Sequence, residues 1–178
     1  MGTPASRAAE RDRRVFLRKP TQRDCGEILE LVRASRRFHR PWVYPPRTRR
    51  QFSAYLRRAR SRRHACFLVC LRADGAIVGV VNLNDIVLGA LRGAFLGFYG
   101  SIQHAGRGYM RDGVRLALRH AFRVLALHRV EANVQPGNRR SIALVKRLGF
   151  RREGLSRRYL KVGGRWRDHE RWAILAEE

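Results

Sequence analysis

The sequence predicts an α+β fold in which helices cover both faces of a mixed, mostly antiparallel β-sheet. The predicted elements run in the order strand, two helices, three strands, helix, strand, short helix and three closing strands. Such an order, without strict strand–helix alternation, is typical of this class. With 178 residues, 44% of them hydrophobic, the chain is large enough to bury one core. We therefore expect a single domain at residues 14–178, preceded by a flexible segment at residues 1–13.

Apolar runs and turn residues locate the strands. The predicted strands span residues 15–18, 65–72, 76–84, 94–102, 128–134, 151–153, 158–162 and 167–175. The pair Asp74-Gly75 is a hairpin signal between the second and third strands, and the pair Gly163-Gly164 is expected to join the last two strands. Cys66 and Cys70, four residues apart in one strand, should share a face as small core residues.

Capping residues mark the starts of the first two helices. Thr21 with Asp24, and Thr48 with Gln51, have the spacing of a capping box or a close variant of it. Between these helices, residues 41–46 contain three prolines and cannot form regular helix. The aromatic side chains of this loop either line a substrate mouth or close the edge of the core.

The charge of the chain is strongly positive. Lys+Arg 39 against Asp+Glu 14 gives a net charge of +25 and a pI near 11.8. This balance suits anionic partners, such as nucleic acid, a ribosomal surface or a polyphosphate cofactor, but dispersed arginine is also typical of an arginine-rich proteome. No apolar run reaches the roughly 18 residues of a membrane helix, and no apolar signal core is present. Three cysteines without metal-ligand spacing indicate a reducing cytoplasm and no metal site.

The turn at residues 103–108 has the features of an anion site. It follows an apolar strand and precedes a long amphipathic helix that begins near Arg107. The first helical turn offers backbone N–H groups without intrahelical partners, and the helix dipole adds positive potential. Gly106 and Gly108 let a phosphate approach the backbone. The sequence therefore predicts a pyrophosphate site that is neither a P-loop nor a dinucleotide fingerprint.

The spacing Gln103-x-x-Gly106-x-Gly108 resembles the acetyl-CoA signature of the GNAT acetyltransferases. The second half of the chain carries further motifs in the order and spacing of that family. They are Arg129-x-Glu131-Ala132, Pro136-Gly137-Asn138 with Ser141, Leu148-Gly149-Phe150, and the closing Trp166-Arg167-Asp168-His169. The chain is most similar to the RimJ/RimL branch, which acetylates the N-termini of ribosomal proteins, over about residues 15–175.

The resemblance implies the GNAT fold, with the sheet split into a V after the strand at residues 94–102, and acetyl-CoA as the acetyl donor. The pantetheine arm would pair with the open edge of that strand, and the pyrophosphate would lie on the glycine-rich turn. The cofactor-binding residues that the resemblance implies are Tyr99, Ser101, Ile102, Gln103, Gly106, Arg107, Gly108, Tyr109, Met110, Asn138 and Ser141.

Direct transfer of acetyl to an amine, which the resemblance implies, has three chemical needs: a neutral amine, donors for the thioester oxygen, and a proton for the leaving thiolate. We expect backbone N–H groups near Tyr99 to Ser101 to serve the oxygen and the Ser141 hydroxyl to serve the thiolate. Glu131 is the candidate base, acting through water; alternatively it is a structural carboxylate tied to an arginine. Many relatives have a tyrosine acid where this chain has Val145.

Three functions stay open from the sequence: acetylation of a protein N-terminus, acetylation of a small amine, and non-catalytic binding of acyl-CoA or RNA. An α-amine has a pKa near 7.7–8.0 and a lysine near 10.4, so an enzyme without an obvious strong base fits an α-amine better. Asp85 and Tyr159 are further candidates for the acceptor cleft. The lone histidines, His39, His104, His120 and His128, are expected to be structural. The chain is expected to be a monomer or a homodimer.

Overall fold

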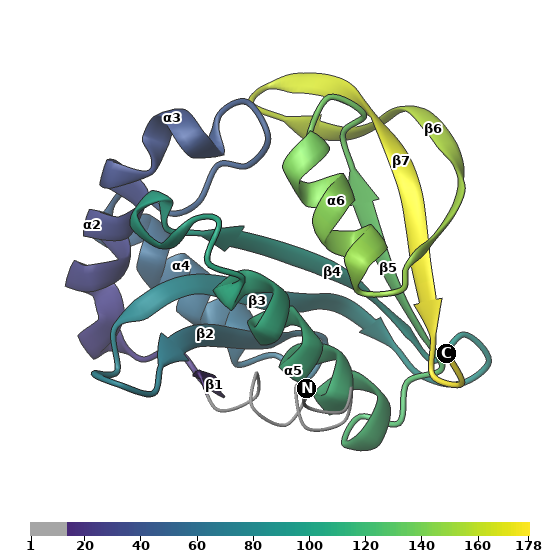
Figure 1. The fold of residues 1–178 in the computed structure, drawn as a ribbon, viewed down its shortest axis with the longest axis horizontal. Coiled ribbons are helices and arrows are strands. Elements are labelled where there is room, and N and C mark those ends of the chain that lie inside the picture. The colour runs from purple at the N-terminus through teal and green to yellow at the C-terminus, as the bar shows by residue number, and fades with distance from the viewer. Residues whose placement is uncertain (1–13) are drawn as a thin grey trace, which may run out of the picture.

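The computed structural model describes residues 14–178, and one seven-stranded sheet runs through them (Figure 1). The strands are β1 Val15–Arg18, β2 Ala65–Leu71, β3 Ile77–Val87, β4 Gly93–Gly100, β5 Arg129–Val134, β6 Arg151–Val162 and β7 Arg165–Leu175. They lie in the order β1-β2-β3-β4-β5-β7-β6. Only β4 and β5 are parallel, which confirms a mixed, mostly antiparallel sheet. The segment predicted to be flexible, residues 1–13, lies outside the described residues.

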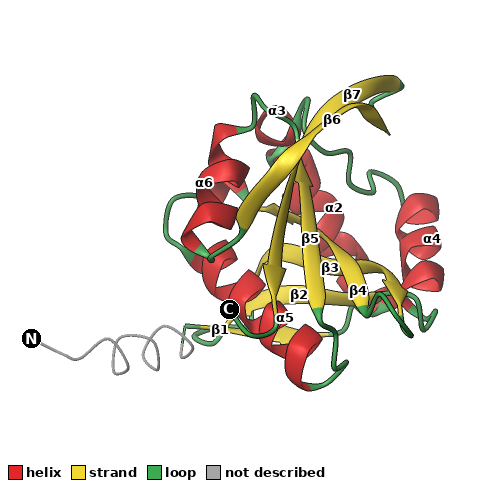
Figure 2. Ribbon diagram, turned by 90° about the vertical axis from the view of Figure 1, so that its right-hand side faces the viewer, coloured by secondary structure: helices red, strands yellow, loops and turns green. Residues whose placement is uncertain are grey.

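Helices cover both faces of this sheet, as the sequence predicts. They are α2 Cys25–Ala34, α3 Arg36–His39, α4 Arg49–Ala59, α5 Tyr109–Arg123 and α6 Arg139–Arg147, with single 3-10 turns η1 Gln22–Asp24 and η2 Ile102–His104. Figure 2 shows α4 on one side of the strands and α6 on the other. Two separate apolar clusters fill the two faces. Cys66 and Cys70 both lie in the cluster under α2 and α4, as their spacing predicts.

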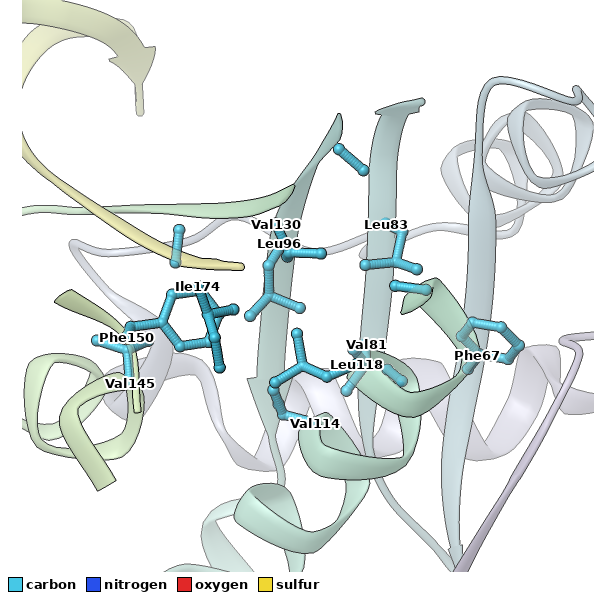
Figure 3. Packing of buried hydrophobic residues seen from close by; sticks show 14 of the residues in the cluster. Phe67, Val81, Leu83, Leu96, Val114, Leu118, Val130, Val145, Phe150 and Ile174 are labelled. Atoms are coloured by element: carbon cyan, nitrogen blue, oxygen red, sulfur yellow. The ribbon is translucent and has the colours of Figure 1, made fainter. Parts of the chain in front are cut away.

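The larger cluster joins α5 and α6 to the sheet (Figure 3). Val114 and Leu118 of α5 pack toward Val81 of β3. Burial of aliphatic side chains such as these is the main favourable term in folding, about 1.5–3 kcal/mol for each one fully buried. The cluster thus fixes α5, and with it the glycine-rich turn that precedes α5, against the sheet.

β4 and β5 separate after a short paired stretch. β5 pairs with β4 only at Gly93, Ala94 and Phe95. Beyond Phe95 the two strands diverge (Figure 1), while β4 stays paired with β3 as far as Gly100. The edge of β4 that faces β5 is therefore open toward its C-terminal end. This confirms the V-shaped split of the sheet.

Both capping signals are present. The Thr21–Asp24 pair forms a capping box before η1 and α2. Thr48 accepts a hydrogen bond from the Gln51 backbone N–H at 3.2 Å, but the Gln51 side chain reaches the N–H of Arg47 rather than that of Thr48. Each cap satisfies N–H groups that a helix start would otherwise leave unpaired.

Some element boundaries differ from the sequence prediction. β6 is one strand of 12 residues where two short strands are predicted, because register shifts against β7 interrupt its side-chain alternation. The long helix begins at Tyr109 rather than Arg107, since Gly108 has a φ of 82°, outside the helical region. The strand predicted at residues 94–102 ends at Gly100, and η2 follows. The four-residue helix α3 is an addition that the sequence does not predict.

Candidate active site

The turn before α5 presents a row of unpaired backbone donors. The N–H groups of residues 106–111 have no hydrogen-bond partner among the described residues. Gly108 is the N-cap of α5, and no side chain caps the helix. Gly106 and Gly108 have φ values of 78° and 82°, which favour glycine over any other residue. Six free donors at a helix start form a ready anion site, and the pyrophosphate that the sequence assigns to it stays a prediction.

The donors lie further along the chain than the sequence suggests. The N–H of Ile102 donates to the Ser35 hydroxyl at 3.0 Å, and that of Gln103 donates to the Ser101 hydroxyl at 3.2 Å. The next two N–H groups, at His104 and Ala105, donate back into the η2 turn. The backbone of η2 is therefore satisfied within the protein. What remains for a ligand is the row at residues 106–111, which we call the anion site.

Arginine side chains surround the anion site. A Cβ placed on Gly108 would lie 3.3 Å from the Arg14 guanidinium and 3.6 Å from that of Arg111. Arg14 also donates to the Arg107 carbonyl at 3.2 Å and pairs with Asp112. Asp112 is fully buried in the first turn of α5. This carboxylate therefore holds Arg14 beside the helix start, where its charge adds to that of the helix dipole.

The anion site is held close to the end of β4 by a close approach of helix and sheet. Met110, in the first turn of α5, packs over Gly79 of β3 and Gly100 of β4. A Cβ on Gly79 would overlap the Met110 sulfur, and one on Gly100 would lie 2.8 Å from Met110 Cγ. Met110, predicted to bind the cofactor, thus serves to set the distance between the anion site and the open strand edge.

The open edge of β4 offers two backbone donors. The Ser101 N–H donates to the Val78 carbonyl of β3 at 2.8 Å. Because groups two residues apart on a strand point the same way, the N–H of Tyr99 also faces β3, while those of Phe98 and Gly100 face the gap toward β5. Within the predicted range of donors for the thioester oxygen, Gly100 is therefore available, and Tyr99 and Ser101 are engaged. Phe98 is an additional donor that sequence reasoning missed.

His39 fixes the end of this open edge. Its Nε2 lies 2.8 Å from the Gly100 carbonyl, so Nε2 carries the proton and donates it. The ring is 4% exposed and meets the Tyr99 ring edge-on at 5.4 Å. Burial lowers the pKa of His39, and the charge of Arg47 adds to this effect, so the imidazole is neutral near pH 7. The predicted role of His39 is structural. Its hydrogen bond holds the carbonyl of Gly100, the residue whose N–H is a candidate donor to the thioester oxygen.

The segment from Ser35 to Tyr44 contacts both arms of the V. On the β4 side it holds η2 through Ser35 and Gly100 through His39. On the β5 side, the Trp42 carbonyl accepts from Gln135 at 3.3 Å and its ring lies against Gly137. Tyr44 lies against Gly163 at the tip of the β6–β7 hairpin. Of the two predictions for this loop, its position at the open end of the V favours the substrate mouth.

Asn138 and Ser141 lie together at the start of α6. The Asn138 side chain accepts from the Ser141 N–H at 3.2 Å and caps the helix. The Ser141 side chain is half-buried, and its hydroxyl has no hydrogen-bond partner among the described residues. The neighbouring Arg140 lies over the Phe38 ring at 5.1 Å, so the start of α6 adjoins α3 at the mouth of the V. Both residues thus lie where the resemblance implies, and their roles stay predictions.

Val145 is fully buried in the larger cluster, beside Phe150 and Ile174 (Figure 3). Its side chain has no polar atom to offer a leaving thiolate. The acid that many relatives have at this position is therefore absent from the chain, and Ser141 remains the candidate for that step.

Glu131 is engaged in an ion-pair network. Its carboxylate accepts from Arg129 Nε at 2.8 Å, and Arg129 also pairs with Glu153. Glu131 lies opposite Phe95, at the last paired position before the V opens. Gly100 is five residues further along β4, about 16 Å at the usual strand rise. The ion pair with Arg129 favours the structural alternative for Glu131, and its role as a base acting through water stays a prediction.

The remaining candidates lie apart from the β4 edge. Asp85 pairs with Arg63 at 3.3 Å, near the end of β3 that adjoins the start of β4. Tyr159 is 37% exposed on β6 and meets the His169 ring edge-on. In the described part of the chain, no group of three potential ligands could hold a metal ion. Over the same residues, no helix is long and apolar enough to cross a membrane.

A diphosphate joined to an extended amide-containing arm fits this geometry. The anion site supplies six N–H donors beside the guanidinium groups of Arg14 and Arg111, and the open edge of β4 supplies strand-like backbone pairing. Coenzyme A thioesters have both chemical features. This fit to coenzyme A depends on α5 and β4, which the packing of Met110 against Gly100 keeps close together.

Comparison with known proteins agrees with a site for a coenzyme A thioester. Residues 14–151 match the family model described as Acetyltransferase (GNAT) domain. The probable N-acetyltransferase YjcK of Bacillus subtilis is 37% identical over 153 residues, which cover 86% of this chain and 82% of that protein. The [ribosomal protein uS5]-alanine N-acetyltransferase of Escherichia coli is 36% identical over 102 residues, 57% of this chain and 53% of that protein.

Solved structures show the same fold. Mycobacterium smegmatis RimJ in complex with CoA-disulfide has a TM-score of 0.84 and 33% identity, and the match covers 92% of this chain and 82% of that one. Spermidine N-acetyltransferase from Vibrio cholerae, in complex with CoA and spermine, has a TM-score of 0.79 and 23% identity over 92% of this chain and 96% of that one, which shows the fold alone. This chain belongs to the GNAT acetyltransferase family and is an N-acetyltransferase whose acetyl donor is acetyl-CoA.

Proposed function

We propose that this enzyme acetylates the N-terminal α-amine of a protein in the cytoplasm, and that ribosomal proteins are among its acceptors. The observation that carries the proposal is the charge on the segment that begins with α3 at the mouth of the V and continues through α4. Residues 36–63, which include α3 and α4, contain eleven arginines, all exposed, and no acidic residue occurs from residue 31 to residue 73. We call these eleven arginines the arginine field. A polyamine would be repelled there, whereas a peptide N-terminus brings one amine and variable side chains.

Relatives support the same acceptor class. The uS5-alanine N-acetyltransferase acts, by its name, on an alanine of a ribosomal protein. The M. smegmatis RimJ structure is similar over nearly the whole described chain. Neither relative identifies the acceptor of this chain, so the proposal rests first on the charge and then on the likeness.

The chemistry of the site also suits an α-amine. Glu131 is tied to Arg129, and it lies opposite Phe95, five residues before Gly100 on β4. Near neutral pH roughly a tenth of an α-amine is already neutral, but less than about a thousandth of a lysine amine is. An α-amine can therefore attack without a strong base. A lysine acceptor would need a base that these residues do not supply.

In the proposed mechanism the chain's own groups have three roles. The anion site holds the diphosphate of acetyl-CoA, which supplies the activated acetyl group. The N–H of Gly100 donates to the thioester oxygen as charge develops on it. The Ser141 hydroxyl donates its proton to the leaving thiolate as the C–S bond breaks, and the proton that the amine loses restores the hydroxyl through water. The amine enters from the mouth beside the Ser35–Tyr44 segment, and acetyl passes to it with no covalent enzyme intermediate.

Acetylation of a small amine is the second candidate. A spermidine N(1)-acetyltransferase of V. cholerae is 32% identical over 103 residues, 58% of this chain and 59% of that protein. The arginine field opposes a polyamine but leaves neutral or anionic amines open. A non-catalytic binding module is the third candidate, which the valine at position 145 favours.

Thiol release from acetyl-CoA separates these candidates. The purified enzyme is assayed against peptides with free N-termini, the same peptides with blocked N-termini and an internal lysine, spermidine, and amino acids. We expect saturable turnover on the free N-termini alone, with the product mass placing acetyl on the α-amine. Turnover confined to small amines would contradict the proposal, and no turnover on any amine would favour the binding module.

A further inference from the structure

The arginine field is dense, exposed and almost free of counter-charges. Of the ion pairs in the described part of the chain, only that between Arg63 and Asp85, at 3.3 Å, involves it. Two further arginines lie over aromatic rings, Arg47 over Tyr44 and Arg58 over Tyr55. Placing so many like charges within residues 36–63 opposes folding through mutual repulsion, and a polyanionic partner would relieve this repulsion.

Several arginines of the field lie on α4, a helix whose opposite side is buried in the core. α4 turns Phe52, Tyr55 and Leu56 into the core beneath it. Its outer side carries Arg49, Arg50 and Arg57, all exposed. The field is therefore fixed on a packed helix and on α3, rather than on a loose tail. An ordered set of guanidinium groups can bind several phosphates at once, because each presents a planar fork of donors.

An anionic membrane suits this surface less well than a nucleic acid. A helix that lies in a membrane interface buries an apolar face in it. Within residues 36–63, Tyr44 is the one large hydrophobic side chain that is exposed, at 42%. The apolar side of α4 is already buried in the protein. Arginines beside an exposed aromatic ring are instead typical of surfaces that bind single-stranded nucleic acid, where phosphates meet charge and a base stacks on the ring.

We propose that the arginine field binds single-stranded RNA through its phosphates, with the α3 end of the field at the mouth where the acceptor enters. α3, which belongs to the field, is followed directly by the loop that holds Trp42 and Tyr44 at that mouth. The consequence for the substrate rests on the proposed function: an acceptor N-terminus carried by an RNA-bound protein would be delivered to the enzyme by its RNA. The binding itself does not depend on which amine is acetylated.

The salt dependence of binding tests the proposal. The full chain is titrated into a fluorescein-labelled, unstructured 20-nucleotide RNA, and anisotropy is followed from 50 to 200 mM KCl. Contact with about five phosphates predicts a slope of log K against log [salt] near −3.5, or an affinity loss of about 100-fold over this range. The triple variant Arg49→Gln, Arg50→Gln, Arg57→Gln should bind at least about tenfold more weakly at 100 mM KCl, with a slope smaller by about 2.

A matched control removes the same charge elsewhere. Arg123, Arg147 and Arg157 are exposed and lie on α5, α6 and β6. Their triple replacement by glutamine should weaken RNA binding by less than about threefold and leave the slope unchanged. Equal losses in the two triples would overturn the proposal, since binding would then follow net charge alone. An absence of RNA binding at 50 mM KCl would also overturn the proposal.

Two further measurements separate RNA binding from its rivals. Vesicles of mixed phosphatidylserine and phosphatidylcholine are added as competitor; displacement of RNA at matched anionic charge would assign the surface to membranes and overturn the proposal. Thiol release with a free peptide that has no charged side chains is measured for both triples and should match the unmodified chain. Because that assay contains no RNA, failure of RNA binding and failure of the proposed acetylation are seen separately.

Discussion

His39 and Gly100 are joined by one hydrogen bond, yet it lies at the strand end where the acetyl group would react. The imidazole donates to the Gly100 carbonyl, and the N–H of the same residue is a candidate donor to the thioester oxygen. An error of about 1 Å in such a donor costs up to about 100-fold in rate. A residue that no sequence motif singles out thus sets the position of a candidate oxyanion donor.

Replacing His39 tests this positioning role. Glutamine can place an amide N–H near the Nε2 position, whereas asparagine reaches only to the Nδ1 position. We expect His39→Asn to lower kcat by about 10- to 100-fold, because a misplaced donor loses part of what an oxyanion donor supplies. The KM for acetyl-CoA should stay within about twofold, and His39→Gln should retain about a third of kcat or more. Equal loss of kcat in both variants, at equal thermal stability, would contradict the role.

Ser141 tests the leaving-group step. Its hydroxyl has no partner among the described residues, so its loss leaves no buried group unpaired, and the cap from Asn138 uses the backbone N–H alone. We expect Ser141→Ala to lower kcat by about 10- to 100-fold with unchanged KM, the range of a lost proton donor. Steady-state thiol release measures both constants. Equal kcat in Ser141→Ala and the unmodified enzyme would remove the proposed role.

Gly108 tests the anion site. Gly108→Glu places a carboxylate among the free N–H groups and strains a φ of 82°. We expect coenzyme A affinity to fall by at least 100-fold, measured by calorimetry. Gly164→Glu is the matched control, since Gly164 has a φ of 81° at the β6–β7 turn and a Cβ there meets nothing within 4 Å. Similar affinity in the two variants, with both folded, would place the diphosphate elsewhere.

At the scale of elements, the sequence predicts what local rules determine. The capping box at Thr21, the side-chain cap at Thr48, an Asp-Gly turn and glycine stops have short-range causes, and these features are present. What the sequence missed depends on distant partners. The single long β6 needs β7 to carry its register shifts. The satisfied backbone of η2 needs Ser35, which is 67 residues away from Ile102.

The contact between α5 and the sheet shows the same dependence. The resemblance marks Met110 as a cofactor residue because it follows the glycine motif. The structure adds the partner, Gly100, which lets the helix start lie against β4. Without that approach the anion site and the strand edge would not fit one ligand.

A double-mutant cycle measures this contact. Gly100→Ala places a Cβ 2.8 Å from Met110 Cγ, and overpacking of this kind costs about 1–3 kcal/mol in the free energy of unfolding. Met110→Ala removes the obstacle at its own cost in packing. We expect the double variant to be more stable than the sum of the two single effects by about 1 kcal/mol or more, by urea unfolding. Additive effects would mean that the two residues do not limit the approach of α5.

At the scale of the whole molecule, the two faces of the sheet carry different candidate binding surfaces. The anion site lies with α5 on one side of the sheet, and the arginines of α4 lie on the other side, while α3 adjoins the start of α6 at the mouth of the V. The fold class and the anion site follow from the sequence, because they depend on periodicity and on a local glycine pattern. The exposure of all eleven arginines of residues 36–63 does not, since the net charge alone is equally consistent with arginines spread along the whole chain.

The salt dependence of turnover is the corresponding whole-molecule prediction. Two peptides share an N-terminal alanine, one with four acidic residues downstream and the other with four lysines. Attraction to the arginine field should raise kcat/KM for the acidic peptide at low salt, and repulsion should lower it for the basic one. Raising KCl from 50 to 200 mM shortens the screening length, so kcat/KM should fall by about 5- to 10-fold for the acidic peptide and rise for the basic one. The Arg49, Arg50 and Arg57 triple variant should flatten both trends, because it removes three of the charges responsible. If the two peptides respond to salt with the same sign, the field does not face the acceptor path, and polyamine acceptors are no longer disfavoured by its charge.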